Sequence, residues 1–260
     1  MKVEIWSDVV CPWCYIGQRR FERALSQFAH RDDVEVVHRS FQLDPTAPAD
    51  QTEPTPDRLA RKYGTSVAQA KAMMQRVEQT AAAEGLEYHL ANTLSGNTLD
   101  AHRVLHLAKE RGLQHAVLDR FYRAYFTEGQ SVFDTPSLVG LAAEAGLDRV
   151  EVQRVLDEGT YADEVQADGY EAMSLGVQGV PFFVVDGRYG ISGAQPVELF
   201  AQALAQAWAD SHPLAAFGAS QDTSNAGDGV FCEDGSCAVP PSAVSDTAHT
   251  ADAVQESSTR

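Results

Sequence analysis

The chain lacks any long apolar run. Nothing in its 260 residues approaches the roughly 18 consecutive apolar residues that a membrane-spanning helix requires. The amino-terminal segment does not resemble a secretory signal, because the acids Glu4 and Asp8 interrupt the apolar stretch that such a signal needs. If the sequence is the whole gene product, we expect a cytoplasmic protein that has no membrane partner.

Positive charge is also scarce. The chain has 20 Lys and Arg residues against 37 Asp and Glu residues, and its formal net charge is −17. Nucleic acids and anionic lipid surfaces are polyanions, so this charge opposes non-specific attraction to both. We therefore expect no nucleic-acid partner.

Cysteine is rare as well, with four residues in all: Cys11, Cys14, Cys232 and Cys237. A secreted scaffold held together by disulfides would be shorter and denser in cysteine. In a reducing compartment, paired cysteines more often carry out redox chemistry or bind metal. The spacing of Cys11 and Cys14 makes them the first candidates for such chemistry.

The order of sequence patterns predicts an α/β protein. Residues 3–6 and 34–41 have strand character and enclose a helix that starts after Pro12. A proline-rich loop at 44–56 leads into a long helical region that ends near residue 176. Its apolar residues are expected to form a helical core, for example Leu105, Leu107, Phe121, Tyr125 and Leu138.

Several local signals mark where elements begin and end. Thr135 is expected to cap a helix, and Asp148 with Glu151 forms a capping-box pattern. Strand character returns at residues 180–191, where Asp186 and Gly187 predict a hairpin. A last helix follows Pro196.

These patterns predict a helical unit, residues 51–176, inserted between the parts 1–50 and 177–210 of one α/β domain. Residues 211–260 have few large apolar side chains, and such a composition predicts a flexible tail.

The Cys11-Pro12-Trp13-Cys14 sequence is suited to disulfide exchange. A thiolate is the nucleophile in this reaction, and the unpaired N–H groups at a helix start favour negative charge. Pro12 fits the first helical turn because it has no N–H to leave unpaired. Cys11 would attack a substrate disulfide and Cys14 would resolve the mixed disulfide. A zinc site made by all four cysteines and a structural Cys11–Cys14 disulfide are the alternatives.

Other residues are given more ordinary interpretations. His102 and His106 have zinc-like spacing, but Arg103 stands where the HExxH motif has glutamate. We predict no metal site there. Trp13, between the two cysteines, is expected to be partly exposed. Acidic residues near the end of the helical region are interpreted as a solvated helix face: Asp157, Glu158, Asp163, Glu164 and Asp168.

The motifs together resemble the DsbA family of thioredoxin-fold oxidoreductases, and more narrowly its FrnE-like branch. They are Cys-Pro-Trp-Cys-Tyr-Ile-Gly, Phe-Gln-Leu-Asp-Pro, Asn-Thr-Leu-Asp-Ala-His-Arg, Gly-Val-Pro-Phe-Phe-Val and Ser-Gly-Ala-Gln-Pro, and the resemblance covers residues 1 to about 210. It implies a thioredoxin-like fold with an inserted α-helical domain and a flexible C-terminal tail.

The resemblance also implies site roles. Pro181 would follow a cis peptide bond beside the sulfurs, and the backbone of Val180 would pair with an extended substrate. We also expect Pro12, Trp13 and His102 to contact substrate, with simple packing as the alternative for Trp13. Some FrnE-like proteins carry a C-x4-C pair after the last helix, and Cys232 and Cys237 match that pattern. We hypothesise that they form a redox relay with the first pair; two exposed tail thiols without a dedicated role are the alternative.

The predicted function is thiol–disulfide oxidoreduction, as a reductase, isomerase or oxidase acting on protein or small-molecule thiols and disulfides without a cofactor. Kappa-class glutathione transferases and 2-hydroxychromene-2-carboxylate isomerase share the superfamily but typically carry serine where Cys11 stands. A glutathione-dependent transferase or isomerase is therefore one alternative, and a zinc-binding, chaperone-like module is another. The sequence leaves the oligomeric state and the direction of electron flow open.

Overall fold

The computed structural model describes residues 1–213. Cys232 and Cys237 lie outside the described residues, as does nearly all of the tail expected from residue 211.

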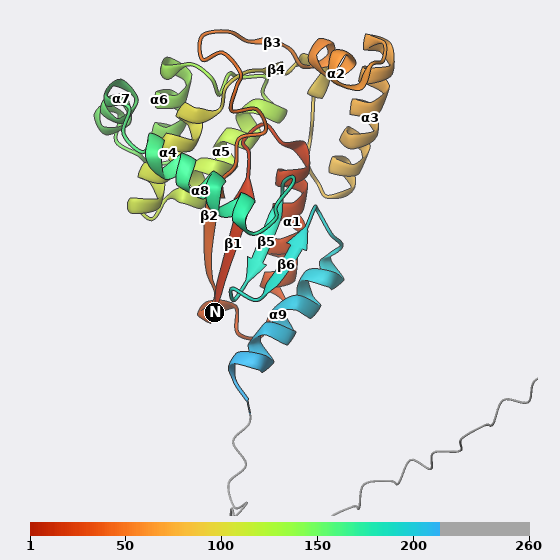
Figure 1. The fold of residues 1–260 in the computed structure, drawn as a ribbon, viewed down its shortest axis with the longest axis vertical. Helices are drawn as coiled ribbons and strands as arrows, with labels where there is room; N and C mark the ends of the chain where they lie inside the picture. The colour runs from red at the N-terminus through yellow and green to blue at the C-terminus, as the bar shows by residue number, and fades with distance from the viewer. Residues whose placement is uncertain (214–260) are drawn as a thin grey trace, which may run out of the picture. The chain divides into compact units, whose positions relative to one another are not determined.

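A four-stranded sheet forms the lower part of the molecule in Figure 1, and its strand order is β2-β1-β5-β6. The central strand β1 (Lys2–Ser7) runs parallel to β2 (Glu35–Ser40) and antiparallel to β5 (Phe182–Val185), which continues into β6 (Tyr189–Ser192). Trp6 in β1 pairs with Phe182 in β5. The segment after β1 and the segment before β5 therefore meet at the same end of the sheet.

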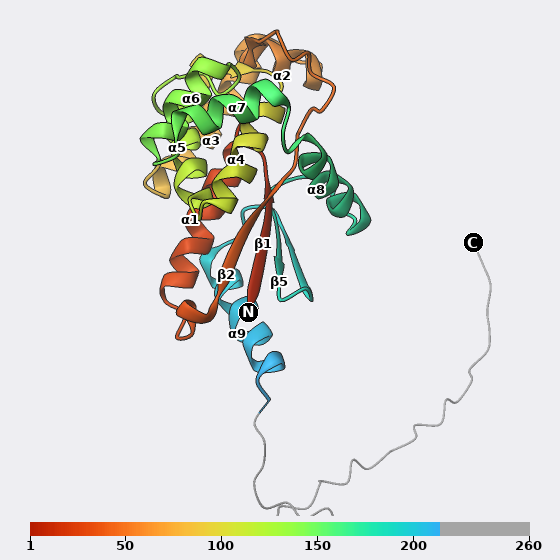
Figure 2. The same cartoon turned by 90° about the vertical axis from the view of Figure 1, so that its left-hand side faces the viewer.

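Helices cover both faces of this sheet (Figure 2). Helices α1 (Pro12–Ser26) and α9 (Val197–Ser211) lie on one face, and α8 (Ala162–Ser174) lies on the other. The first face is closed by a cluster that includes Ile5, Phe183 and Phe200, each no more than 2% exposed. Burying one such side chain stabilises the fold by about 1.5–3 kcal/mol.

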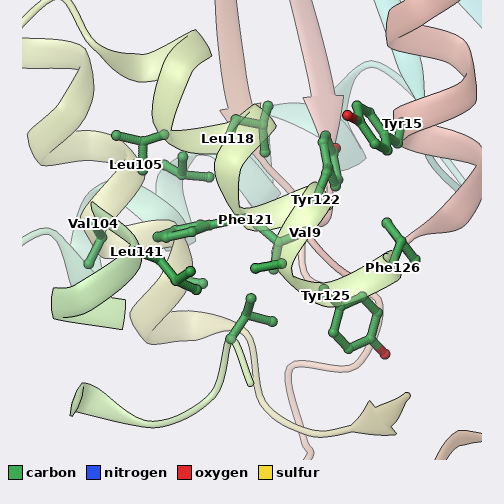
Figure 3. Packing of buried hydrophobic residues seen from close by; sticks show 14 of the residues in the cluster. Val9, Tyr15, Val104, Leu105, Leu118, Phe121, Tyr122, Tyr125, Phe126 and Leu141 are labelled. Carbon is green, nitrogen blue, oxygen red and sulfur yellow. The ribbon is translucent and has the colours of Figure 1, made fainter. Parts of the chain in front are cut away.

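The chain between β2 and α8 forms the upper part in Figure 1, and it is mainly helical. All five apolar residues named above from this region are buried, as predicted. Figure 3 shows part of their packing around Phe121. Two short strands and two 3-10 turns were not predicted. The elements of this region are β3 (Glu53–Pro54), α2 (Thr55–Tyr63), α3 (Val67–Ala83), η2 (Leu90–Asn92), β4 (Leu94–Ser95), α4 (Leu99–Glu110), α5 (Gln114–Phe126), α6 (Thr135–Glu144) and α7 (Arg149–Glu158). The other 3-10 turn, η1 (Arg31–Asp33), lies between α1 and β2.

Most local start signals are confirmed and one is corrected. Asp148 accepts a hydrogen bond from the Glu151 N–H at the start of α7, but the Glu151 carboxylate accepts from Arg111, so only half of the predicted capping box forms. Helix α6 is capped by Asp134, not Thr135, because the Asp134 carboxylate accepts from the Ser137 N–H. The β5–β6 hairpin turns at Asp186 and Gly187, both with positive φ. The predicted α/β class is confirmed.

Among residues 1–213, no helix combines the length and the apolar character needed to cross a bilayer.

Candidate active site

Cys11 lies at the junction between β1 and α1. It is the N-cap residue of α1, and Pro12 is the first helical residue, as the sequence predicted. The Cys11 N–H donates to the Asp8 carbonyl, which closes the turn after β1. The first N–H groups of a helix have no partners within the helix, so this position favours a negatively charged sulfur.

Cys14 lies one helical turn further along and is 2% exposed, against 4% for Cys11. Both residues are free thiols. Burial raises the pKa of the Cys14 thiol well above its usual range, and the neighbouring Cys11 adds to the effect. The negative charge of Asp8 raises this pKa further, although the Asp8 backbone N–H bond to the sulfur opposes it. Cys14 is therefore a protonated thiol at neutral pH.

The segment that precedes β5 meets the start of α1. The Val180–Pro181 peptide bond is cis, as the family resemblance implied. The Cys11 thiol donates to the Val180 carbonyl, with a sulfur–oxygen distance of 3.5 Å. The structure therefore brings Cys11, Cys14, Val180 and Pro181 together, although about 170 residues separate the two segments.

Gly17 allows α1 to lie against Pro181. A Cβ atom added to Gly17 would stand 2.9 Å from Pro181 Cγ and 3.4 Å from Ala194. Real Cβ atoms essentially never approach a neighbour within 3.0 Å. Arg20, one turn later, donates to the Ala194 carbonyl and to the Glu84 carboxylate. This face of α1 therefore packs against two segments, the one before β5 that carries Pro181 and the one after β6 that carries Ala194.

The two residues between the cysteines differ in their surroundings. The Trp13 side chain is 41% exposed, as expected, and presents an apolar surface beside the thiols. The Pro12 carbonyl accepts a hydrogen bond from the Tyr88 hydroxyl at 2.9 Å. Tyr15, just after Cys14, stacks on Tyr122 with ring centroids 4.7 Å apart (Figure 3). The start of α1 is thus embedded in the core of the helical region.

His102 does not line an open groove, so this expectation is corrected. It is 1% exposed, and its Nε2 lies 3.3 Å from Asp8 Oδ1. The other Asp8 oxygen accepts from the Leu43 N–H at 2.7 Å. Asp8 is itself 1% exposed. Asp8 was not among the predicted site residues, although it lies only three residues before Cys11 in the sequence.

The expectation that Asp168 lies on a solvated helix face is also wrong. Asp168 is 3% exposed. Its carboxylate accepts from the Ser40 N–H and from Arg39, and it lies 3.2 Å from His106 Nε2. Burial alone would raise the pKa of Asp168, but the hydrogen bond from His106 and the bond from Ser40 hold it below its usual value. This network attaches α8 to β2.

The comparisons with known proteins agree with this architecture. Residues 2–205 match the DSBA-like thioredoxin domain family. The chain belongs to this family and has its thioredoxin fold. The resemblance stated from the motifs is therefore confirmed at the level of the family.

Three similar proteins differ in how much sequence and structure they share with this chain. The crystal structure of the probable DsbA oxidoreductase SCO1869 from Streptomyces coelicolor is 52% identical, with a TM-score of 0.79, over 92% of this chain and 99% of that one. The uncharacterized protein YwbO of Bacillus subtilis is 31% identical over 78% of this chain and 94% of its own length. The cytosolic disulfide reductase DsbM from Pseudomonas aeruginosa, solved with GSH, is 18% identical with a TM-score of 0.56, over 79% of this chain and 98% of that one, and shows the fold alone. Family and relatives together indicate a thiol–disulfide oxidoreductase.

Proposed function

We propose that Cys11 and Cys14 are the reactive dithiol of a thiol–disulfide oxidoreductase. The observation that carries this proposal is the position of the Cys11 sulfur, at the start of α1 and 3.5 Å from the Val180 carbonyl. An extended substrate that paired with the backbone of Val180 would bring its own sulfur to Cys11. Trp13 and Pro12 would form the adjoining contact surface, beside Pro181.

The reaction transfers two electrons in two steps. The Cys11 thiolate attacks one sulfur of a substrate disulfide, forms a Cys11–substrate disulfide and releases the other substrate sulfur as a thiolate, which takes up a proton. Cys14 then loses its proton and attacks the Cys11 sulfur, which releases the second substrate thiol. The substrate is reduced and the Cys11–Cys14 pair is oxidised. The reverse sequence would oxidise a substrate.

The raised pKa of Cys14 assigns different roles to the two sulfurs. Cys14 must be deprotonated before it can resolve the mixed disulfide, because the thiolate is the nucleophile. We assign the role of proton acceptor in this step to Asp8, a carboxylate that is 1% exposed and whose negative charge raises the pKa of Cys14. His102 Nε2 lies 3.3 Å from Asp8 Oδ1, on the side of the helical region.

The test is dithiothreitol-driven reduction of insulin, followed by turbidity. The native chain should accelerate precipitation and Cys11→Ser should not, while Cys14→Ser should accumulate a mixed disulfide visible by mass spectrometry. Circular dichroism of each variant controls for folding. If the native chain and Cys11→Ser behave alike, the proposal is wrong, and binding of glutathione and zinc becomes the next measurement.

We also propose a family branch, a cellular location, domain bounds and a role for the second cysteine pair. We place the chain in the FrnE-like branch, in the cytoplasm, with residues 51–176 as the inserted helical domain between 1–50 and 177–210. Cys232 and Cys237 would exchange disulfides with the first pair. A Cys232→Ser/Cys237→Ser variant with unchanged turnover would remove the relay.

Glutathione is a candidate small-thiol partner, since the structure of the relative DsbM was solved with GSH. Tight binding of glutathione without a mixed disulfide would favour the transferase or isomerase alternative.

A further inference from the structure

A groove lies beside the edge strand β2, on the face of the sheet that α1 covers. Its volume is about 560 Å³, and it is bounded by α1, β2 and the turn between α4 and α5. Ligand-binding clefts typically have about 300–1,000 Å³. Cys11, Cys14, Val180 and Pro181 are not among its lining residues, so the groove is separate from the dithiol.

The wall formed by α5 is attached to the strand by a pair of hydrogen bonds. Gln114, the first residue of α5, donates from Nε2 to the His38 carbonyl at 2.8 Å and accepts from the His38 N–H at 3.0 Å. Its side-chain amide therefore satisfies the backbone of β2 much as a neighbouring strand would. The groove therefore has one side that is fixed by hydrogen bonds.

Two buried polar side chains line this groove: Gln18, whose Nε2 donates to Glu22, and His38. His38 pairs in register with Ile5, so its ring faces the α1 side of the sheet. Its side chain is 5% exposed, and neither Nδ1 nor Nε2 has a hydrogen-bond partner among residues 1–213. A buried polar group without a partner is costly and calls for an explanation. Burial, with a contribution from the charge of His115, lowers the pKa of His38 to about 3, so the ring is neutral.

The chemistry of the lining defines what would fit. A neutral imidazole has one N–H donor and one acceptor nitrogen, which a hydroxyl group can satisfy because it also donates and accepts. The remaining lining offers apolar contacts from Phe21, Leu25 and Val36. The lining also carries both signs of charge, from the acids Glu22 and Glu35 and the base Lys109, and therefore does not select a ligand of one charge.

We infer that this groove is a binding site for a small, neutral aromatic molecule that carries a hydroxyl group, with the hydroxyl bonded to His38. The ring of His115 lies over that of His38, at a centroid distance of 5.9 Å. The His115 side chain is 59% exposed, and a rotamer change of such a surface side chain takes picoseconds to nanoseconds. Its rotation would open the path to His38.

The experiment compares two probes on the full native chain. 4-Ethylphenol carries the hydroxyl, and 4-ethylanisole has the same body with the hydroxyl proton replaced by a methyl group. Binding is followed by NMR, with the ¹⁵N resonances of the His38 imidazole as the direct readout. We expect 4-ethylphenol to bind about tenfold more tightly, and to shift those resonances, because only it can both donate and accept.

Variants make the comparison specific. His38→Phe keeps a ring of similar size but removes the polar nitrogens. In this variant the affinity for 4-ethylphenol should fall to the affinity for 4-ethylanisole. His89→Phe, at a histidine that is 48% exposed and remote from the groove lining, should change neither affinity. Cys11→Ser should also bind both probes as the native chain does, which separates this site from the dithiol.

Absence of binding at millimolar probe would overturn the inference, and so would equal affinity for the two probes. Unchanged His38 resonances at saturation would do the same. These results need only the native chain, so they hold even where His38→Phe does not fold.

Discussion

Replacing Gly17 with alanine tests the contact between α1 and the loop that carries Pro181. Two effects of opposite sign act on the free energy of unfolding. Alanine is a better helix former than glycine and stabilises a helix interior by about 1 kcal/mol. Against this, the new Cβ would stand 2.9 Å from Pro181 Cγ, inside the shortest distance that Cβ atoms normally show.

Overpacking of this kind typically costs about 1–3 kcal/mol. Pro181 cannot yield easily, because its carbonyl accepts from the Gly193 N–H at 2.8 Å and its ring closes on its own backbone. Ala194, which lies 3.4 Å from the new methyl group, limits movement on the other side. We therefore expect the clash to exceed the gain in helix propensity.

Gly140 provides the matched control. It lies inside α6, and a Cβ added there meets nothing within 4 Å. Gly140→Ala should be stabilised by about 1 kcal/mol. The difference between the two variants isolates the clash, and should make Gly17→Ala less stable than Gly140→Ala by about 1–3 kcal/mol. For a chain of this size, each 1 kcal/mol shifts Tm by about 2–4 °C.

The same substitution should slow disulfide exchange. Displacing Pro181 by a few tenths of an ångström also displaces the Val180 carbonyl from Cys11. Misplacement of reacting groups by about 1 Å can cost about 100-fold in rate, so a shift of this smaller size should lower insulin reduction by roughly tenfold. Thermal unfolding and turbidity measure the two effects. If Gly17→Ala were as stable and as active as Gly140→Ala, the claim that this helix face packs closely against Pro181 would be refuted.

Three further predictions concern buried groups. The raised pKa of Cys14 favours the thiol in the folded state, so the reduced chain should lose stability as pH rises above about 8.5, the ordinary thiol pKa. Urea unfolding of Cys14→Ser should lack that part of the pH dependence. Asp8→Asn should slow resolution of the mixed disulfide while leaving the first attack by Cys11 unchanged, as rapid-quench mass spectrometry can separate. Asp168→Asn should cost about 2–4 kcal/mol at neutral pH, and the deficit should shrink below pH ~4, because the lowered pKa of Asp168 stabilises the fold only while the carboxylate is ionised. Glu171→Gln is the control, because the Glu171 carboxylate is 45% exposed and lies 3.8 Å from Arg39, the arginine that also binds Asp168. This variant should change stability by less than about 0.5 kcal/mol.

The parts of the site that follow from local rules could be predicted from the sequence. The start of α1 at Pro12, and the placement of Cys11 just before it, depend only on neighbouring residues. The hairpin at Asp186 and Gly187 is equally local, because both residues tolerate positive φ. The juxtaposition of Val180 with Cys11 came instead from the family resemblance, since no local rule relates residues so far apart.

Contacts that depend on tertiary packing were missed. Asp168 belongs to an acidic helix, and that pattern alone predicts solvent exposure. Its burial depends on Arg39 and His106, which lie on other elements. The burial of His102 was missed for the same reason, because its contact with Asp8 joins α4 to the turn after β1. The binding of the Gln114 side chain to the edge of β2 is a third case.

The position of the dithiol has a consequence for its redox chemistry. Cys11, Cys14 and Tyr15 pack into the same buried cluster as α4 and α5, and Val180, in the segment that leads into β5, packs against that cluster. Any packing interaction that differs between the dithiol and disulfide forms must therefore change their relative free energies. For a two-electron couple, about 1.4 kcal/mol of such a difference changes the reduction potential by about 30 mV. Substitutions in the helical region, far from either sulfur, can thus decide whether the same pair of cysteines reduces its substrates or oxidises them.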